Sequence, residues 1–150
     1  MKDVLEEIVA HKRMEIEQMK REVPESELHQ QVERLILGED GRARRSMREA
    51  LINSKTGIIA EFKRKSPSKG WIKEDGRADI IPQSYQDNGA TALSILTDNK
   101  YFGGCDDFIR TARKSVTIPI LYKNFVIDEY QLFQARLCGA DATLLIAADL

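Results

Sequence analysis

The spacing of four short β-rich runs is the feature that most constrains the fold of this chain. The runs "IIAEF", "TALSIL", "IPILYK" and "ATLLIA" begin near positions 58, 91, 118 and 142. Each unit therefore has roughly the 30 residues that a strand and its crossover helix require. Because strands joined by such crossovers lie parallel in one sheet, the spacing predicts a βαβαβαβ arrangement with helices covering a parallel sheet.

Two of the joints between helix and strand resemble each other. The segments "NGATALSIL" (Asn88 to Leu96) and "CGADATLLI" (Cys138 to Ile146) each place a glycine where a helix is expected to end, followed by alanine and the next strand. Glycine suits a left-handed helix end because it has no Cβ. The weak repeat indicates repeated βα units.

Two architectures fit this pattern, an open doubly wound sheet and a (β/α)₈ barrel. No Gly-x-Gly-x-x-Gly follows any of the strands, so the nucleotide-binding sheet lacks its best local evidence. A closed barrel typically needs about 250 residues, whereas this sequence has 150. A barrel here is expected to be an N-terminal half barrel with two unpaired edges, formed by the first and fourth strands.

Residues 1–55 have a helical rather than a β-rich pattern, and they are expected to form a helical extension before the barrel part, residues 56–150. A helical stripe of apolar residues runs toward Pro24 and consists of Val4, Leu5, Ile8, Val9 and Ile16. Ser26 is expected to cap a second helix that runs to Leu37 and is broken by Gly38 and Gly41. A third helix is predicted at "SMREALINS", residues 46–54.

Several polar residues are interpreted as structural. A basic cluster is expected to be a solvated helix start, and it consists of Arg42, Arg44, Arg45 and Arg48. His11 and His29 have no partner nearby in sequence and are expected at the surface. Cys105 and Cys138 stand alone, so both are interpreted as reduced structural thiols rather than disulfide partners or metal ligands.

The charge balance excludes some classes of partner. The formal net charge is −1, from 23 Lys and Arg against 24 Asp and Glu, which disfavours nucleic acid and anionic membranes as partners. No apolar run approaches the ~20 residues of a membrane span. The N-terminus "MKDVLEEIVAHK" lacks the apolar centre of a signal peptide, so a cytoplasmic protein is expected.

Three charged residues are expected to converge on one rim of the sheet. Glu61 and Lys63 share a face at the end of the first strand, and Lys123 ends the third strand. Barrels and doubly wound sheets both place active sites at this end. A salt bridge with a snorkelling edge lysine is the structural alternative, but three such charges together favour a site. Partly desolvated neighbouring lysines would have a lowered pKa, which suits proton transfer.

The loops that follow these strands favour an anionic substrate with a ring. Ser66 to Gly70 offers hydroxyls, backbone amides and a cation around a turn. The loop "TDNKYFGG" adds Tyr101 and Phe102, although Phe102 could equally pack in the core.

These motifs resemble the indole-3-glycerol-phosphate synthase family. The resemblance is carried by "IIAEFKRKSPSKG", "ALSILTDNKYFGG" and "PILYKNFVIDEYQLFQARLCGADATLLIAADL", in that order, and covers essentially the whole chain with its helical extension. It implies a (β/α)₈ barrel. It also implies conversion of 1-(2-carboxyphenylamino)-1-deoxyribulose 5-phosphate into indole-3-glycerol phosphate, with release of carbon dioxide and water and with no metal or organic cofactor.

The resemblance also implies roles for single residues. Lys123 matches the general acid that protonates the substrate carbonyl, Lys63 matches a lysine that contacts anionic groups of the substrate and takes part in proton transfer, and Glu61 matches the neighbouring carboxylate. Ser66 and Pro67 match substrate-lining positions of the first loop. The residues that match the pocket around the anthranilate ring are Phe102, Phe125 and Leu144.

Two departures from the family pattern follow. Asn124 stands where the family usually has aspartate after the lysine, and the lost negative charge is expected to change the pKa of Lys123. The remaining strands, which in the family supply another glutamate, an asparagine, an arginine and the phosphate loops, are absent. The isolated chain is therefore expected to be inactive or nearly so, and to self-associate or to need a complementing C-terminal half.

Two alternatives remain beside this reading. The first is a non-catalytic half-barrel module that binds itself or a partner through its exposed sheet edges. The second is another phosphate-handling barrel such as phosphoribosylanthranilate isomerase, which fits the fold but not the motif from Glu61 to Pro67.

Overall fold

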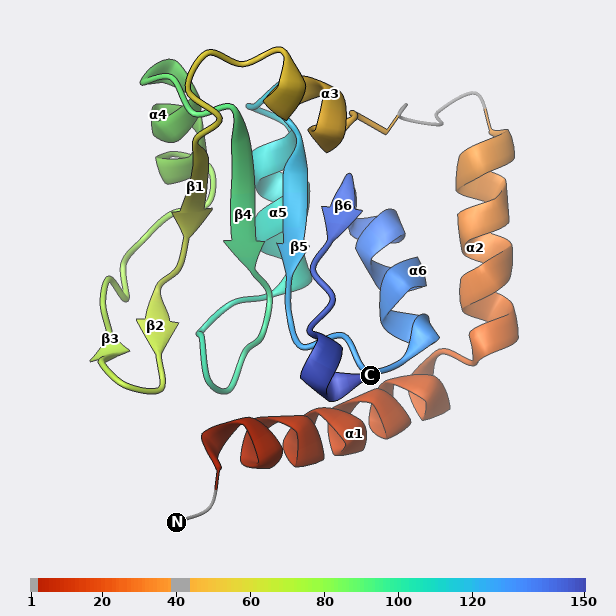
Figure 1. Cartoon of the computed structure of the whole chain (residues 1–150). Helices are drawn as coiled ribbons and strands as arrows, with labels where there is room; N and C mark the ends of the chain where they lie inside the picture. Colours follow the sequence, from red (N-terminus) through yellow and green to blue (C-terminus); the bar gives the residue numbers. More distant parts are fainter. Residues whose placement is uncertain (1–2, 39–43) are drawn as a thin grey trace.

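The predicted βα units form one parallel sheet in the computed structural model, which describes residues 3–38 and 44–150. The order of the strands is β1-β4-β5-β6, and every neighbouring pair is parallel. Figure 1 shows these strands pointing the same way. Their bounds are Ile59–Phe62 (β1), Ala92–Leu96 (β4), Ile120–Lys123 (β5) and Ala142–Thr143 (β6). The predicted parallel βαβαβαβ arrangement is confirmed.

Three helices follow the first three strands of this sheet and pack against one of its faces (Figure 1). Their bounds are Ile81–Asp87 (α4), Asp106–Arg113 (α5) and Glu129–Cys138 (α6). A short antiparallel pair, β2 (Lys65–Ser66) and β3 (Gly70–Trp71), lies in the loop after β1. A single 3₁₀ turn, Ala147–Asp149, follows β6.

Alternation along the strands sorts the side chains onto two faces. The face toward α4, α5 and α6 forms the core, and its strand residues are Phe62, Leu93, Ile95, Ile120 and Tyr122. The opposite face carries the polar side chains of Glu61, Ser94 and Lys123. Within the described residues, β1 and β6 are edge strands, and Ile59 on β1 is 44% exposed.

The two predicted glycine joints have the expected backbone. Gly89 after α4 has φ of 100° and Gly139 after α6 has φ of 99°, a left-handed conformation that costs an L-residue with a Cβ much more than it costs glycine. Asp128 starts α6 with a capping box, in which its carboxylate accepts from the amide of Tyr130 while Gln131 accepts from the amide of Asp128.

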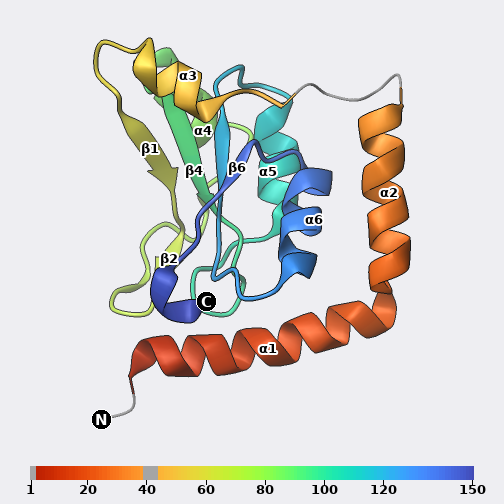
Figure 2. The same ribbon diagram turned by 45° about the vertical axis from the view of Figure 1, so that its right-hand side comes forward.

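The N-terminal helices wrap around this layer. Their bounds are Val4–Glu22 (α1), Glu25–Leu37 (α2) and Met47–Ile52 (α3). Figures 1 and 2 show α1 crossing below the carboxyl ends of the strands, α2 standing beside α6, and α3 near the opposite end of the sheet. Ile16 of α1 and Leu28 of α2 share a buried cluster with Tyr130 of α6, so these helices are anchored to the sheet layer by apolar contact.

Some local expectations about these helices are wrong. Ser26 does not cap α2, because the helix begins at Glu25 after Pro24 with no side-chain cap. The predicted end of α2 at Leu37 is confirmed, and so is the start of α3, where Ser46 accepts from the amide of Glu49. Gly41 and Arg42 lie outside the described residues.

The histidines and cysteines have definite environments. His11 pairs with Glu15 at 3.2 Å, and the His29 ring stacks on Phe133, so both histidines are half-buried with partners rather than freely exposed. Both cysteines are free. Burial raises the pKa of the Cys138 thiol to about 12.

A buried carboxylate fastens the amino ends of the strands. Asp141, just before β6, accepts from the guanidinium of Arg113 and from the amides of Ile120 and Arg45, at 2.9 and 2.7 Å. The Arg45 guanidinium donates to the carbonyls of Val116 and Ile118. Arg45 was expected to be solvated, and this is wrong, whereas Arg44 and Arg48 are exposed as predicted.

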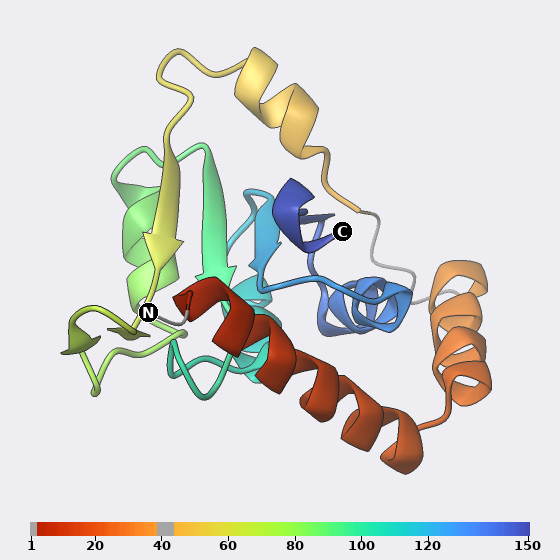
Figure 3. The same ribbon diagram turned by 60° about the horizontal axis from the view of Figure 1, so that its bottom comes forward.

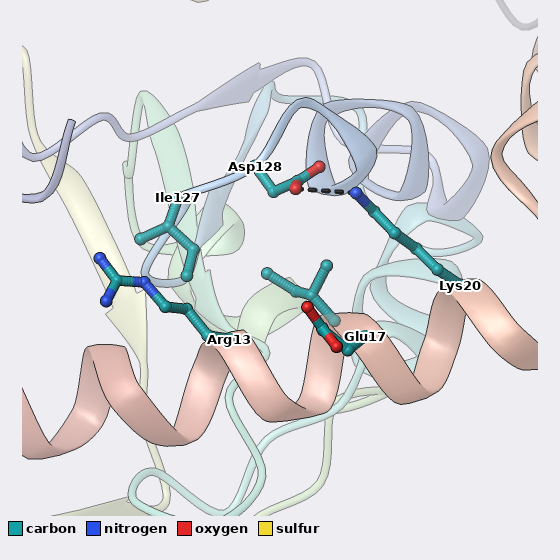
Figure 4. A pocket seen from close by; sticks show the side chains of 6 residues that line it. Arg13, Glu17, Lys20, Ile127 and Asp128 are labelled. Carbon is teal, nitrogen blue, oxygen red and sulfur yellow. Dashed lines mark hydrogen bonds and ion pairs between the residues drawn. The ribbon is translucent and has the colours of Figure 1, made fainter.

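A hollow of about 460 Å³ lies between α1 and the start of α6, and charged side chains line it (Figure 4). Lys20 donates to Asp128 at 2.8 Å and pairs with Glu25 at 2.6 Å. Partial burial, the largest single influence, would raise the pKa of Asp128, but the hydrogen bond from Lys20, the hydrogen bond from the amide of Tyr130 and the charge of Lys20 together outweigh it, so the pKa lies below its ordinary value.

The Asp141→Asn variant should be strongly destabilised. An amide cannot pair with the buried Arg113, whose charge is then uncompensated, and a loss of about 3–5 kcal/mol in the free energy of unfolding is expected. Urea denaturation measures this loss. Asp107→Asn is the control, because the pair of Asp107 with Arg110 is exposed, and it should leave the midpoint nearly unchanged. Equal midpoints for the two variants would contradict the role of Asp141.

The Asp128→Asn variant should lose a pH-dependent part of the stability. Asparagine caps helices as well as aspartate does, so the variant isolates the charge. Because the pKa is lowered in the folded state, the stabilising contribution is complete above about pH 4 and is lost as the pH falls through the folded pKa. Urea midpoints of wild type and variant should differ at pH 6 and converge in acid. A gap independent of pH would refute the assignment.

Candidate active site

The carboxylate of Glu61 holds both predicted lysines at the carboxyl end of the sheet. Lys123 Nζ lies 3.3 Å from Glu61 Oε2, and Lys63 Nζ lies 3.5 Å from Glu61 Oε1. The parallel register pairs Glu61 with Ser94, and the Ser94 hydroxyl donates to Glu61 Oε2 at 3.0 Å. The structure thus brings together three side chains that the sequence analysis placed on one rim.

The balance of charge in this group suits an anionic ligand. One carboxylate faces two ammonium groups, and all three side chains keep about a third of their surface exposed. A negatively charged ligand can therefore approach without full desolvation of the lysines. A lysine at hydrogen-bond distance from a reacting oxygen can also donate a proton to it.

Two aromatic rings lie together on loops at the same end of the sheet. Phe102 follows β4 and Phe125 follows β5, with ring centroids 5.9 Å apart and planes tilted by 35°. Both are half-buried, which leaves part of each ring free for contact. Leu144 follows β6, is also half-buried, and its amide donates to the carbonyl of Tyr122 at 3.3 Å.

The loop after β1 is more ordered than the expected simple turn. Ser66 is buried and its hydroxyl accepts from the amide of Lys69 at 3.2 Å, while Pro67 is exposed. The β2–β3 pair, which the sequence analysis missed, closes this turn. The guanidinium of Arg64 lies between the rings of Trp71 and Phe108, at 5.4 and 5.3 Å. These contacts hold the loop against α5.

Asn124 does not contact Lys123. Its side-chain nitrogen Nδ2 donates to the Thr97 hydroxyl at 2.8 Å, and its side-chain oxygen Oδ1 accepts from the backbone amide of Phe125 at 2.8 Å. Alternation along the chain directs this buried side chain away from the face that carries Lys123. The side chain of Asn124 therefore makes no direct contact with the ammonium group of Lys123.

The sequence analysis missed the charged contact between α1 and the loop after β4. Lys12 Nζ lies 2.6 Å from Asp98 Oδ1, and both residues are buried. A signal was present, since Lys12 is four residues from both Ile8 and Ile16 in the middle of the apolar stripe of α1. A cation at such a position needs a buried partner.

A second buried polar pair lies on the helix side of the sheet. The Tyr122 hydroxyl donates to Asp106 at 3.1 Å. Burial raises the pKa of Asp106 and raises that of Tyr122 well above its ordinary value. This pair lies on the opposite face from Glu61, so it is separate from the candidate site.

The described part of the chain has neither a metal-binding cluster nor a membrane-spanning helix. Residues 3–38 and 44–150 contain no group of three or more histidine, cysteine, aspartate or glutamate side chains placed to hold a metal ion. No helix among these residues is both long and apolar enough to cross a membrane.

Comparison with known proteins identifies the family. A family model described as indole-3-glycerol phosphate synthase matches residues 5–150. The chain is 53% identical over 150 residues to the indole-3-glycerol phosphate synthase of Bacteroides thetaiotaomicron, covering 100% of this chain and 55% of that protein. For the synthase of Albidiferax ferrireducens the identity is 43% over 150 residues, covering 100% and 56%.

The match is complete for this chain but partial for its relatives. The synthase of Prochlorococcus marinus strain AS9601 is 44% identical over 149 residues, covering 99% of this chain and 49% of that protein. The chain spans about half the length of these curated relatives. The family has the (β/α)₈ barrel fold, and the four parallel strands with their helices correspond to part of such a barrel. This chain belongs to the indole-3-glycerol phosphate synthase family.

Proposed function

We propose that this chain forms the N-terminal part of an indole-3-glycerol phosphate synthase, with residues 1–55 as its helical extension and residues 56–150 as the first half of its barrel. The observation that supports the proposal best is the pairing of Glu61 with both Lys63 and Lys123 at the carboxyl end of the sheet. This is the end at which barrel enzymes carry their active sites.

The proposed substrate is 1-(2-carboxyphenylamino)-1-deoxyribulose 5-phosphate, and its groups match the site. Its carboxylate would pair with Lys63, and its aromatic ring would lie in a pocket formed by Phe102, Phe125 and Leu144. Ser66 and Pro67 would line the same pocket from the first loop. Cation, aromatic and hydroxyl groups around one rim are the contacts that such a ligand requires.

The reaction assigns Lys123 the role of general acid. The ring carbon that bears the carboxylate attacks the ribulose carbonyl carbon, so a carbon–carbon bond forms while Lys123 gives a proton to the carbonyl oxygen. The bond to the carboxylate then breaks with release of carbon dioxide, and its electron pair restores the aromatic ring. In the last step the new hydroxyl takes up a proton and leaves as water, while the neighbouring CH2 group gives up a proton and the carbon–carbon double bond of the indole forms. Glu61 would hold both lysines in position through this sequence.

The remaining groups of the site would come from the part of the family's length that this chain does not cover. The resemblance implies a further glutamate, an asparagine, an arginine and the phosphate-binding loops there. Without them the phosphate and the proton transfers after ring closure lack partners. We therefore expect the isolated chain to have little or no synthase activity.

Complementation tests this proposal. This chain is mixed with the part of the Bacteroides thetaiotaomicron synthase that it does not cover, and indole-3-glycerol phosphate is followed by its fluorescence. The mixture should turn over the substrate, while each piece alone should not. Lys123→Ala should lower turnover of the mixture about 100-fold or more, since it removes a general acid.

Lys114→Ala is the control for this experiment, because Lys114 is an exposed lysine outside the site. It should leave the turnover of the mixture unchanged. Full turnover by the Lys123→Ala mixture would rule out the assigned acid, and near-normal turnover by the isolated chain would contradict the need for the other half.

A second candidate function is a non-catalytic module that self-associates. The observation that favours it is the pair of edge strands, with Ile59 exposed on β1. Unpaired edges and exposed apolar surface promote pairing between chains.

Sedimentation across a range of protein concentrations measures this association. The wild-type chain should form dimers or larger species, and Ile59→Lys should weaken them. Met14→Lys is the matched control, since Met14 is exposed on α1 away from the sheet edges. A strictly monomeric wild-type chain would contradict the module. If the chain is a non-catalytic module, Lys123→Ala should leave its self-association unchanged, and there is no activity for the variant to lose.

A further inference from the structure

A buried cation on α1 has partners on two elements. Lys12 is 4% exposed, and its Nζ lies 2.6 Å from both Asp98 Oδ1 and Glu15 Oε2. Asp98 is 1% exposed and lies 86 residues away in the sequence. Desolvating such charges costs free energy that apolar side chains would not cost. The pair therefore calls for a role beyond packing α1 onto the sheet.

Asp98 organises the loop that follows β4. Its second carboxylate oxygen accepts from the amide of Tyr101 at 2.9 Å, and its carbonyl accepts from the amide of Gly104 at 2.7 Å. The carbonyl of Asn99 accepts from the amide of Gly103 at 2.8 Å. Hydrogen bonds to Asp98 and Asn99 thus fix the backbone of residues 98–104, and the Asp98 carboxylate is the group that pairs with Lys12.

A second set of contacts from α1 reaches the same loop. The Tyr101 hydroxyl donates to Glu7 at 3.2 Å, and the Tyr101 ring meets the His11 ring edge-on with centroids 5.8 Å apart. Glu7 and His11 lie four residues apart on one face of α1, and both reach Tyr101, in the loop that also holds Asp98, the partner of Lys12. Figure 3 shows α1 passing across the carboxyl ends of the strands, where this loop emerges.

We propose that Lys12 is a positioning residue that, through Asp98, holds the loop of residues 97–105 and thereby sets the position of the Phe102 ring against Phe125. The consequence for substrate rests on the proposed function, in which these rings receive the aromatic part of the substrate. Lys12 touches no reacting atom in this proposal, and it acts only through the loop.

The loop position can be read from this chain alone. Trp71 is the only tryptophan in the sequence, and its ring lies so close to Gly103 that a Cβ there would fall 2.7 Å from Trp71 Cζ3. The fluorescence of Trp71 therefore reports whether the loop is in place. The amides of Gly103 and Gly104, both bonded within the loop, give a second readout by hydrogen exchange.

Lys12→Met should release the loop. Trp71 is already 45% exposed, so its emission should shift only slightly to longer wavelength when the contact with Gly103 is lost. Exchange of the two glycine amides is the stronger readout and should become about tenfold faster or more. Lys20→Met is the matched control, because it removes a lysine of the same helix whose partners are Glu25 and Asp128, away from the loop. It should change neither readout.

Unchanged emission and exchange in Lys12→Met would overturn the proposal. If circular dichroism shows that this variant is unfolded, Lys12→Gln replaces it, because glutamine can donate a hydrogen bond to Asp98 without the charge. Lys12→Gln should show the same two changes to a smaller extent, because the hydrogen bond is kept while the charge is lost, and the absence of both changes would overturn the proposal.

A kinetic measurement separates positioning from a general loss of structure. In the complemented enzyme, Lys12→Met should raise KM about tenfold and leave kcat within about twofold, since ring contacts stabilise bound substrate and transition state alike. A fall in kcat with unchanged KM would refute the positioning role. If the wild-type mixture has no turnover, the proposed function fails, whereas the Trp71 and exchange readouts still decide whether Lys12 holds the loop.

Discussion

The parallel register of the sheet is the constraint on which the rest of the structure depends. Because every strand runs the same way, every loop that leads from a strand into a helix emerges at one end. Glu61 and Lys123 are 62 residues apart in sequence, yet the register brings their side chains within 3.3 Å. The opposite end of the sheet is fastened by Asp141, which joins β5, α5 and the segment before α3. The stabilising hydrogen bonds of Asp141 and the candidate active-site residues thus lie at opposite ends of the sheet.

The helices before the barrel part are tied to both ends of this sheet. At the carboxyl end, α1 contributes Lys12 to the pair with Asp98 and Ile16 to a cluster with Tyr130. At the amino end, Arg45 reaches Asp141 and two backbone carbonyls. The segment before β1 therefore shares hydrogen bonds and apolar contacts with the sheet layer, which makes it part of the same folded unit.

The sequence predicted what depends on local pattern. Strand spacing, the left-handed glycines Gly89 and Gly139, and the shared rim of Glu61 and Lys123 all follow from periodicity and alternation. What it missed depends on partners far away in the chain. Arg45 looked solvated because its partners are 71 or more residues distant. Ser26 lost its capping role to a helix that starts one residue earlier, after Pro24.

The β2–β3 pair and the contact of Lys12 with Asp98 are two features that local sequence pattern did not predict. Two strands of two residues each are too short to leave a periodic signal. Lys12 did leave one, as a cation inside an apolar stripe, but no local rule names Asp98 as its partner. The roles proposed for Ser66, Pro67, Phe102, Phe125 and Leu144 come from the family resemblance, because single loop residues have no pattern that distinguishes a binding role from packing.

The contact between Trp71 and Gly103 couples two segments that the chain order keeps apart. The indole ring belongs to the loop after β1, and the glycine belongs to the loop after β4. Because the ring occupies the space above the glycine, the loop that carries Ser66 and the loop that carries Phe102 are packed against each other. The packing of either loop therefore depends on the position of the other.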